Sequence, residues 1–189
     1  METLGLIGGM SWHSTATYYR IINEVVAAAR GGHASARISL ESLDFEEIRQ
    51  CQIRGDWDTA AALLTEAGQR CVRSGATTVA ICTNLMHKVA PEVEAGIDVP
   101  LAHIGDAVAA EAARNGWGRL GILGTRWVME EDFYAGRLAR HGIDAVIPDA
   151  ADREAVDTIV FDELTKGIVR AASRTTYVET IRRLADQGA

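Results

Sequence analysis

Residues 75–88 constrain the fold more than any other part of the sequence, because they predict a strand that runs directly into a helix. The β-branched, apolar run at 77–81 follows a glycine turn signal and indicates a buried strand. The strand ends in Cys82, Thr83 and Asn84, after which apolar residues are spaced as on one face of a helix. In open α/β sheets, ligands bind where strand ends and helix N-termini present backbone N–H groups. We therefore expect these three residues to lie at a ligand site.

The thiol of Cys82 allows two interpretations. Most free cysteines behave as small core hydrophobes, and Cys82 could be one of them. The N-terminus of a helix, in contrast, lowers the pKa of an adjacent thiol and favours the thiolate. The polar neighbours Thr83 and Asn84 favour the second interpretation, so we expect a functional thiol at Cys82.

Strand and helix patterns alternate along the whole chain. The segment after Asp44 reads as a short helix that this residue caps. Alternation of this kind predicts an α/β fold with mostly parallel sheets. Strands are predicted near residues 4–10, 37–43, 77–81, 99–104, 119–126 and 144–148, and the later helices near 57–73, 105–114, 153–169 and 174–187.

A weak internal repeat divides the chain into two halves. Residues 4–12 resemble residues 120–127, and in both copies a short strand ends in a glycine turn. The first copy leads on to the strand before Cys82, whereas the second stops where the matching strand would begin. We therefore predict two α/β lobes, at residues 1–98 and 99–189, and expect the second to lack its final strand. We expect the 189-residue chain alone to be unstable for that reason.

Composition and charge narrow the choice of partners. The 189 residues carry a net charge of −7, which argues against nucleic acid or an anionic membrane as the main partner. The sequence has no apolar run of the length that a transmembrane helix needs. Three cysteines without a CxxC pair and five histidines without zinc-type spacing predict neither disulfides nor a metal site. We therefore expect a reduced, cytoplasmic protein that needs no metal.

A glycine turn follows the first predicted strand. Its GxxGG spacing is neither GxGxxG nor a P-loop, so no nucleotide cofactor is expected. A bare backbone that approaches a small anion fits better, with Met10 and Ser11 facing the ligand. Elsewhere, His87 and Lys88 lie one turn into the predicted helix, where they could be near the site, but a solvated helix face is favoured for them. Lys166 is by default a surface cation near a helix C-terminus.

Several motifs, taken together and in order, resemble the aspartate/glutamate racemase family. The resemblance covers essentially the whole chain, and its most specific part is the combination of GGMSW with CTNLMHK. The matching segments are LIGGMSW at 6–12, SLDF at 42–45, CQ at 51–52, ICTNLMHK at 81–88, LGTR at 123–126, EEDFY at 130–134, FDEL at 161–164 and KG at 166–167.

This resemblance implies a fold and a mechanism. Members of the family have two Rossmann-like lobes related by a pseudo-twofold axis, with the substrate in the cleft between them. They racemise amino acids without pyridoxal phosphate (PLP) or metal, because two cysteines exchange protons with opposite faces of the α-carbon. Cys82 matches the first of these, and Lys166 matches a cation that pairs with a substrate carboxylate. The positions that match residues around the substrate are Met10, Ser11, Gln52, Thr83 and Asn84.

The second family cysteine has no counterpart in the sequence. In the family it lies in a Gly-Cys-Thr-Glu stretch, on a strand that would follow Ala189, and neither Cys51 nor Cys71 has a strand-end context. We therefore expect an aspartate/glutamate racemase, acting on a small amino acid or dicarboxylate as a homodimer, that is inactive as the 189-residue chain. The alternatives are a single-cysteine isomerase or decarboxylase of the same superfamily, and a catalytically dead module that binds small acids.

Overall fold

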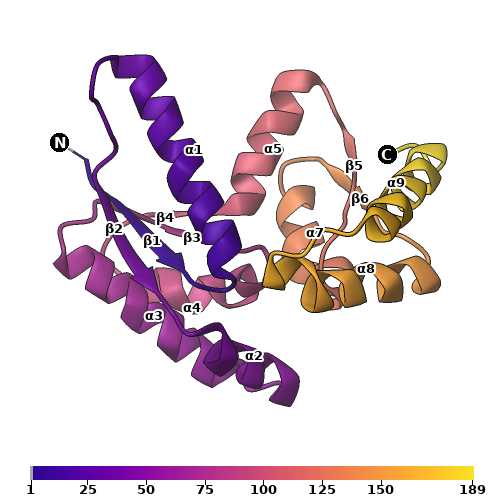
Figure 1. Cartoon of the computed structure of the whole chain (residues 1–189), viewed down its shortest axis with the longest axis horizontal. Helices are drawn as coiled ribbons and strands as arrows, with labels where there is room; N and C mark the ends of the chain where they lie inside the picture. Colours follow the sequence, from indigo (N-terminus) through magenta and orange to yellow (C-terminus); the bar gives the residue numbers. More distant parts are fainter. Residues whose placement is uncertain (1) are drawn as a thin grey trace. The chain divides into compact units, whose positions relative to one another are not determined.

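The computed structural model describes residues 2–189, which form two compact units (Figure 1). The first unit ends at His103 and the second begins at Ile104. The boundary expected from the sequence lies five residues earlier, between residues 98 and 99. Each unit has its own parallel sheet, so the predicted α/β class with mostly parallel sheets is confirmed.

The sheet of the first unit has the order β2-β1-β3-β4 among residues 2–103, and every neighbouring pair is parallel. Leu6 and Ile7 of β1 and Val79 and Ile81 of β3 are fully or almost fully buried, which explains the apolar runs in the sequence. The strands are β1 (Leu4–Gly8), β2 (Ile38–Ser42), β3 (Thr78–Ile81) and β4 (Leu101–Ala102).

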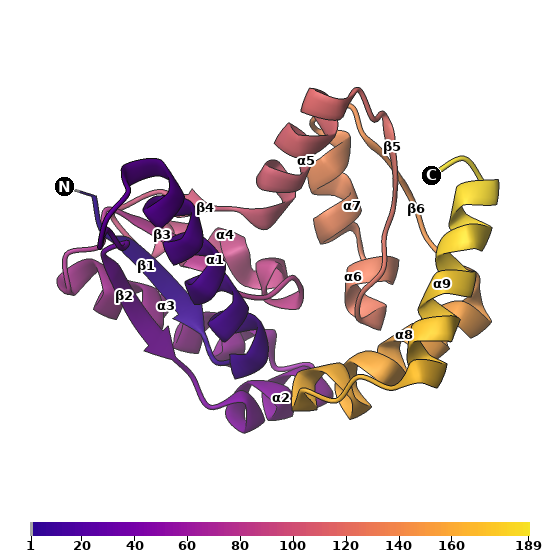
Figure 2. The ribbon, with the colours of Figure 1, turned by 45° about the horizontal axis from the view of Figure 1, so that its top comes forward.

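Helices cover both faces of this sheet, and α1 and α3 lie on opposite sides of it (Figures 1 and 2). Leu64 and Cys71 belong to the fully buried face of α3, which packs against β1, β2 and β3. The predicted cap at Asp44 is confirmed, because its side chain accepts a hydrogen bond from the backbone N of Glu46 at 2.9 Å. The helical elements are α1 (Trp12–Arg30), α2 (Phe45–Arg54), α3 (Trp57–Arg73), η1 (Leu85–Val89) and α4 (Ala90–Ala95).

The helix predicted after Cys82 is split in two. The segment begins as the short 3₁₀ helix η1, and the α-helix α4 starts only at Ala90. Pro91 at the second position of α4 explains the break, because proline lacks an N–H and is accommodated only in the first turn of an α-helix.

The second unit contains the parallel pair β5 (Arg119–Gly121) and β6 (Asp144–Val146). The guanidinium of Arg137 on α7 bonds both carboxylate oxygens of Asp106 on α5, at 2.7 and 2.5 Å, and joins these two helices. None of the helices within residues 2–189 combines the length and apolar character needed to cross a bilayer. The helical elements are α5 (Ile104–Asn115), α6 (Arg126–Glu130), α7 (Asp132–Ala139), α8 (Ala150–Asp162), η2 (Leu164–Lys166) and α9 (Ala171–Asp186).

Candidate active site

The candidate site lies at the carboxyl edge of the sheet in the first unit. Because β1 and β3 are parallel and Ile7 is in register with Ile81, the loops that follow the two strands begin side by side. Met10 and Ser11 lie on the first loop, and Cys82 begins the second. The sheet therefore brings together residues that are about seventy positions apart in the sequence.

Hydrogen bonds hold the backbone of Cys82 on both sides. Its N–H donates to the carbonyl oxygen of Ile7 at 2.9 Å, which extends the β1–β3 ladder by one step. Its own carbonyl oxygen lies 2.9 Å from the hydroxyl of Ser14, which lies at the same distance from the carbonyl oxygen of Ser11. The first turn of α1 thus ties the two loops together.

The loop between β1 and α1 is closed by Thr15. The hydroxyl oxygen of Thr15 accepts a hydrogen bond from the N–H of Gly9 at 2.9 Å and donates to the carbonyl oxygen of Ser11 at 3.2 Å. Gly9 has a φ of +92°, which favours glycine, and its backbone lies against that of Leu43. Met10 and Ser11 are buried in this loop at 4% and 7% exposure. The glycine turn identified in the sequence therefore shapes the site.

Gln52 reaches the same region from α2. It is 3% exposed, and its amide nitrogen lies 3.3 Å from the sulfur of Met86 in η1. The guanidinium of Arg49 donates to the amide oxygen of Gln52 at 3.5 Å. Arg49 was not among the residues expected from the sequence, although its position one helical turn before Gln52 places both on one face of α2. Arg49 brings a positive charge to this part of the first unit.

The pKa of the Cys82 thiol is shifted in the direction opposite to the sequence prediction. Cys82 is 0% exposed, and burial, with a smaller contribution from the nearby Cys71 thiol, raises its pKa from 9.0 to about 12. The expectation of a favoured thiolate was wrong. The helix that follows is the five-residue η1, whose short dipole is outweighed by the cost of burying a charge.

The expectation that His87 lies on a solvated helix face was also wrong. The residues of η1 up to His87 are all buried, and His87 itself is 2% exposed. Lys88 is half-buried and lies over the ring of Trp57, with its Nζ 4.5 Å from the ring centroid. Both residues are covered because η1 is packed into the first unit rather than lying on its surface.

Lys166 lies in the second unit, unlike the other six predicted site residues. It ends η2, its side chain is 58% exposed, and its Nζ is 3.5 Å from Asp162.

Thr83 is half-buried and Asn84 is exposed, so both present polar groups at the edge of the first unit. Among residues 2–189, no group of three or more His, Cys, Asp and Glu side chains is arranged to hold a metal ion.

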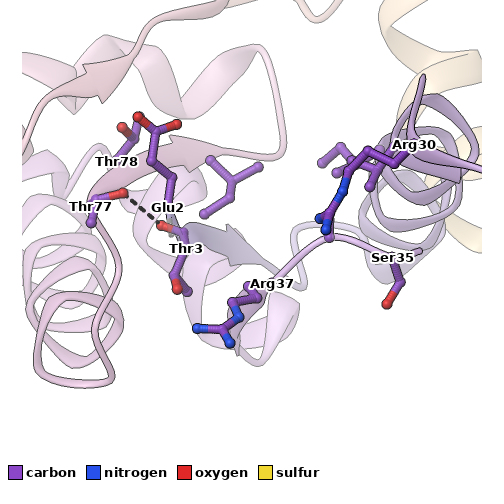
Figure 3. Close-up of a pocket in the computed structure, with 11 residues that line it drawn as sticks. Glu2, Thr3, Arg30, Ser35, Arg37, Thr77 and Thr78 are labelled. Atoms are coloured by element: carbon purple, nitrogen blue, oxygen red, sulfur yellow. Dashed lines mark hydrogen bonds between the residues drawn. The ribbon is translucent and has the colours of Figure 1, made fainter. Parts of the chain in front are cut away.

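A cavity of about 480 Å³ opens at the opposite end of the same sheet. It lies at the amino ends of β1 and β3, where the hydroxyl of Thr77 donates to the carbonyl oxygen of Thr3 at 3.3 Å (Figure 3). Arg30 and Arg37 also line it (Figure 3). Because Cys82 follows the carboxyl end of β3, this cavity is separate from the candidate active site.

Burial of Cys82 predicts a loss of stability at alkaline pH. The folded state keeps the thiol protonated up to a pKa of about 12, whereas the unfolded chain loses the proton near 9.0. The contribution of the buried, protonated thiol to the unfolding free energy is therefore fully present below pH 9 and is lost as the pH rises from 9 to 12. At pH 10.5, wild type should lose about 2 kcal/mol more unfolding free energy than Cys82→Ala, relative to pH 8.

Urea unfolding of both proteins at the two pH values measures this difference. Other buried groups with raised pKa values, such as Tyr134 and Cys71, are present in both proteins and cancel in the comparison. Equal losses in wild type and Cys82→Ala would show that the pKa of Cys82 is not raised by folding.

Comparison with known proteins shows which family this chain belongs to. The sequence profile of the Asp/Glu/hydantoin racemase family matches residues 7–189. The chain belongs to this family. It is 50% identical to a candidate Asp/Glu racemase of known structure from Yersinia pestis, with a TM-score of 0.91, over 100% of this chain and 83% of that one.

Two further racemase-family structures are similar. An aspartate racemase homologue from Pyrococcus horikoshii is 30% identical, with a TM-score of 0.77, over 89% of this chain and 74% of that one. The aspartate racemase of Picrophilus torridus is 19% identical, with a TM-score of 0.74, over 98% of this chain and 77% of that one. At that identity, the likeness to the Picrophilus torridus protein concerns the fold alone. The family predicted from the sequence motifs is confirmed.

Proposed function

We propose that this protein is a PLP-independent amino-acid racemase for aspartate or glutamate, with Cys82 as an acid/base thiol at the α-carbon. The observation that carries the proposal is the position of Cys82, a thiol at the carboxyl end of β3 with Thr83 and Asn84 beside it, in a chain of the racemase family. In parallel sheets this edge is where ligands bind.

The chemistry requires the thiolate of Cys82 to remove the α-proton. The C–H electron pair then stays on the α-carbon and spreads into the adjacent carboxylate. Inversion also needs an acid on the opposite face that returns a proton, and the sequence offers no second cysteine at a strand end for that role. With a pKa of about 12, roughly one thiol in 10⁵ is ionised at pH 7. Because so little thiolate is present, proton removal is slow unless the resulting carbanion is stabilised. Strong hydrogen bonds in a closed site can provide that stabilisation.

The polar groups around Cys82 suit this task. We propose that Thr83, Asn84 and Ser11 donate hydrogen bonds to the substrate, and that Met10 shields the α-carbon from water. Gln52 and its partner Arg49 bring an amide and a guanidinium that can bind a carboxylate. Because Cys82 is 0% exposed, we expect the substrate to displace part of the loops around it.

Proton exchange at the α-carbon tests the proposal. The protein is incubated with L-aspartate or L-glutamate in D₂O at pH 8, and loss of the α-proton is followed by NMR while chiral chromatography measures the D-enantiomer. Deuterium in both enantiomers indicates a two-sided racemase. Deuterium in the L-enantiomer alone indicates Cys82 acting as a one-sided base, which favours the single-cysteine alternative. Binding without exchange favours the small-acid binding module.

Lys166 is proposed to bind the distal carboxylate of an acidic substrate. Lys166→Ala should weaken binding of aspartate by about 1.5–3 kcal/mol, the scale of a charge-assisted hydrogen bond, and should affect alanine much less. Arg174→Ala is the control, because it removes one exposed positive charge from the same unit. Calorimetric titration measures both variants, and equal small effects would remove the basis for naming an acidic substrate. The homodimer and the cytoplasmic location expected from the sequence stay predictions.

A further inference from the structure

Two buried histidines lie beside the Cys82 loop, outside the proton transfer proposed above. His87 in η1 is 2% exposed, and His103, directly after β4, is 6% exposed. Their ring centroids are 4.5 Å apart, with an angle of 66° between the planes, which is an edge-to-face contact. Since β3 and β4 are neighbouring parallel strands, the two rings join the segments that follow these strands.

The ring of His87 is bonded to the loop that carries Cys82. Its Nδ1 lies 2.8 Å from the carbonyl oxygen of Thr83, and its backbone N–H donates to the carbonyl oxygen of Asn84 at 3.1 Å. A carbonyl oxygen can only accept, so Nδ1 must carry the proton. His87 therefore satisfies two successive carbonyl groups of the loop, one through its side chain and one through its backbone.

We propose that His87 is a positioning residue that holds the loop of Cys82, Thr83 and Asn84 through its Nδ1–H, while the ring of His103 fixes its orientation. Ile7 and Ser14 already hold the backbone of Cys82. The bond from His87 fixes the next carbonyl along, and with it the direction of the proposed substrate contacts. The importance of His87 for catalysis rests on the proposed function, whereas the hydrogen bond from its Nδ1–H to Thr83 does not.

The protonation state of the ring can be observed directly. Long-range ¹H–¹⁵N NMR of protein labelled at histidine distinguishes a ring protonated at Nδ1 from one protonated at Nε2. We expect the His87 signal, assigned by its loss in a His87 variant, to show the Nδ1–H form near pH 8. A His87 ring protonated only at Nε2 would overturn the proposal, and the tautomer is read from wild-type protein, with the variant used only to assign the signal.

Two matched substitutions test the positioning role. His87→Asn keeps an N–H at the place of Nδ1, whereas His87→Phe keeps a planar ring but has no donor. In His87→Phe the part-buried carbonyl of Thr83 lacks this partner, so the loop should open more often and expose the thiol of Cys82. In His87→Phe we expect iodoacetamide to alkylate Cys82 about ten times faster or more, and in His87→Asn at close to the wild-type rate.

Cys71 supplies an internal control in the same molecule. It is also 0% exposed, on α3, and its alkylation reports opening of the unit as a whole. Peptide mass spectrometry gives the ratio of Cys82 to Cys71 modification, which should rise in His87→Phe and return to the wild-type value in His87→Asn. An unchanged ratio in His87→Phe, or a raised ratio in His87→Asn, would contradict the positioning role.

The exchange assay separates this inference from the proposed function. If wild type exchanges the α-proton of aspartate, His87→Phe should lower kcat/KM and His87→Asn should restore it. If wild type neither binds nor exchanges aspartate or glutamate, the proposed function fails, and the tautomer and the alkylation ratio still decide the role of His87.

Discussion

Cys82→Ser should reduce α-proton exchange on the protein's substrate by about 10³-fold. A well-placed general base contributes about 10²–10⁴-fold to proton transfer, and a serine hydroxyl is a far weaker acid than a thiol, so almost none of it is ionised. The substitution keeps nearly the same shape and leaves the backbone bonds to Ile7 and Ser14 available. The measurement is the NMR rate of α-proton loss in D₂O.

Cys71→Ser is the matched control for this experiment. Both cysteines are fully buried in the first unit, but Cys71 lies on α3, where its thiol is 3.7 Å from the carbonyl oxygen of Leu6. A serine there can make the same bond, so Cys71→Ser should retain most of the exchange activity. Full exchange by Cys82→Ser would show that another group removes the proton, and would end the proposed mechanism.

Gly9→Ala should destabilise the protein by roughly 3 kcal/mol or more, the largest stability effect that we expect from a single methyl group. A Cβ at Gly9 would overlap the backbone carbonyl oxygen of Leu43 and lie 2.6 Å from its nitrogen. Backbone atoms cannot move aside as a flexible side chain can, so the loop after β1 or the segment after β2 must shift. Such a shift also displaces Met10 and Ser11, and activity should fall with stability.

Gly75→Ala provides a control at a glycine with nearly the same φ. Gly75 has a φ of +91°, against +92° at Gly9, but nothing lies within 4 Å of its Cβ position. Gly75→Ala should therefore cost only about 1 kcal/mol, the penalty of a left-handed alanine. Urea unfolding of the two variants isolates the steric part, and equal losses would show that the loop at Gly9 adapts without cost.

The elements that depend on neighbouring residues were predictable from the sequence. The apolar run before Cys82 is β3, the side chain of Asp44 caps α2, and the strand–helix alternation gives parallel sheets. These features follow from residue spacing and from capping chemistry, which act over a few positions. The place of Cys82 at a strand end could be inferred in the same way, whereas the family was inferred from the resemblance of several motifs along the whole chain.

The chemical state of the site was decided by the tertiary structure. The hydroxyl of Ser14 bonds the carbonyl of Cys82, 68 positions away, and the ring of His87 contacts that of His103. The pKa of Cys82 depends on how completely other segments exclude water from the thiol. The residues next to Cys82 in the sequence do not show how complete that exclusion is. The order of residues along the chain is enough to predict which strand end carries the thiol. Only the packing of distant segments decided that this thiol is buried and protonated, because desolvation is a property of the whole surrounding volume.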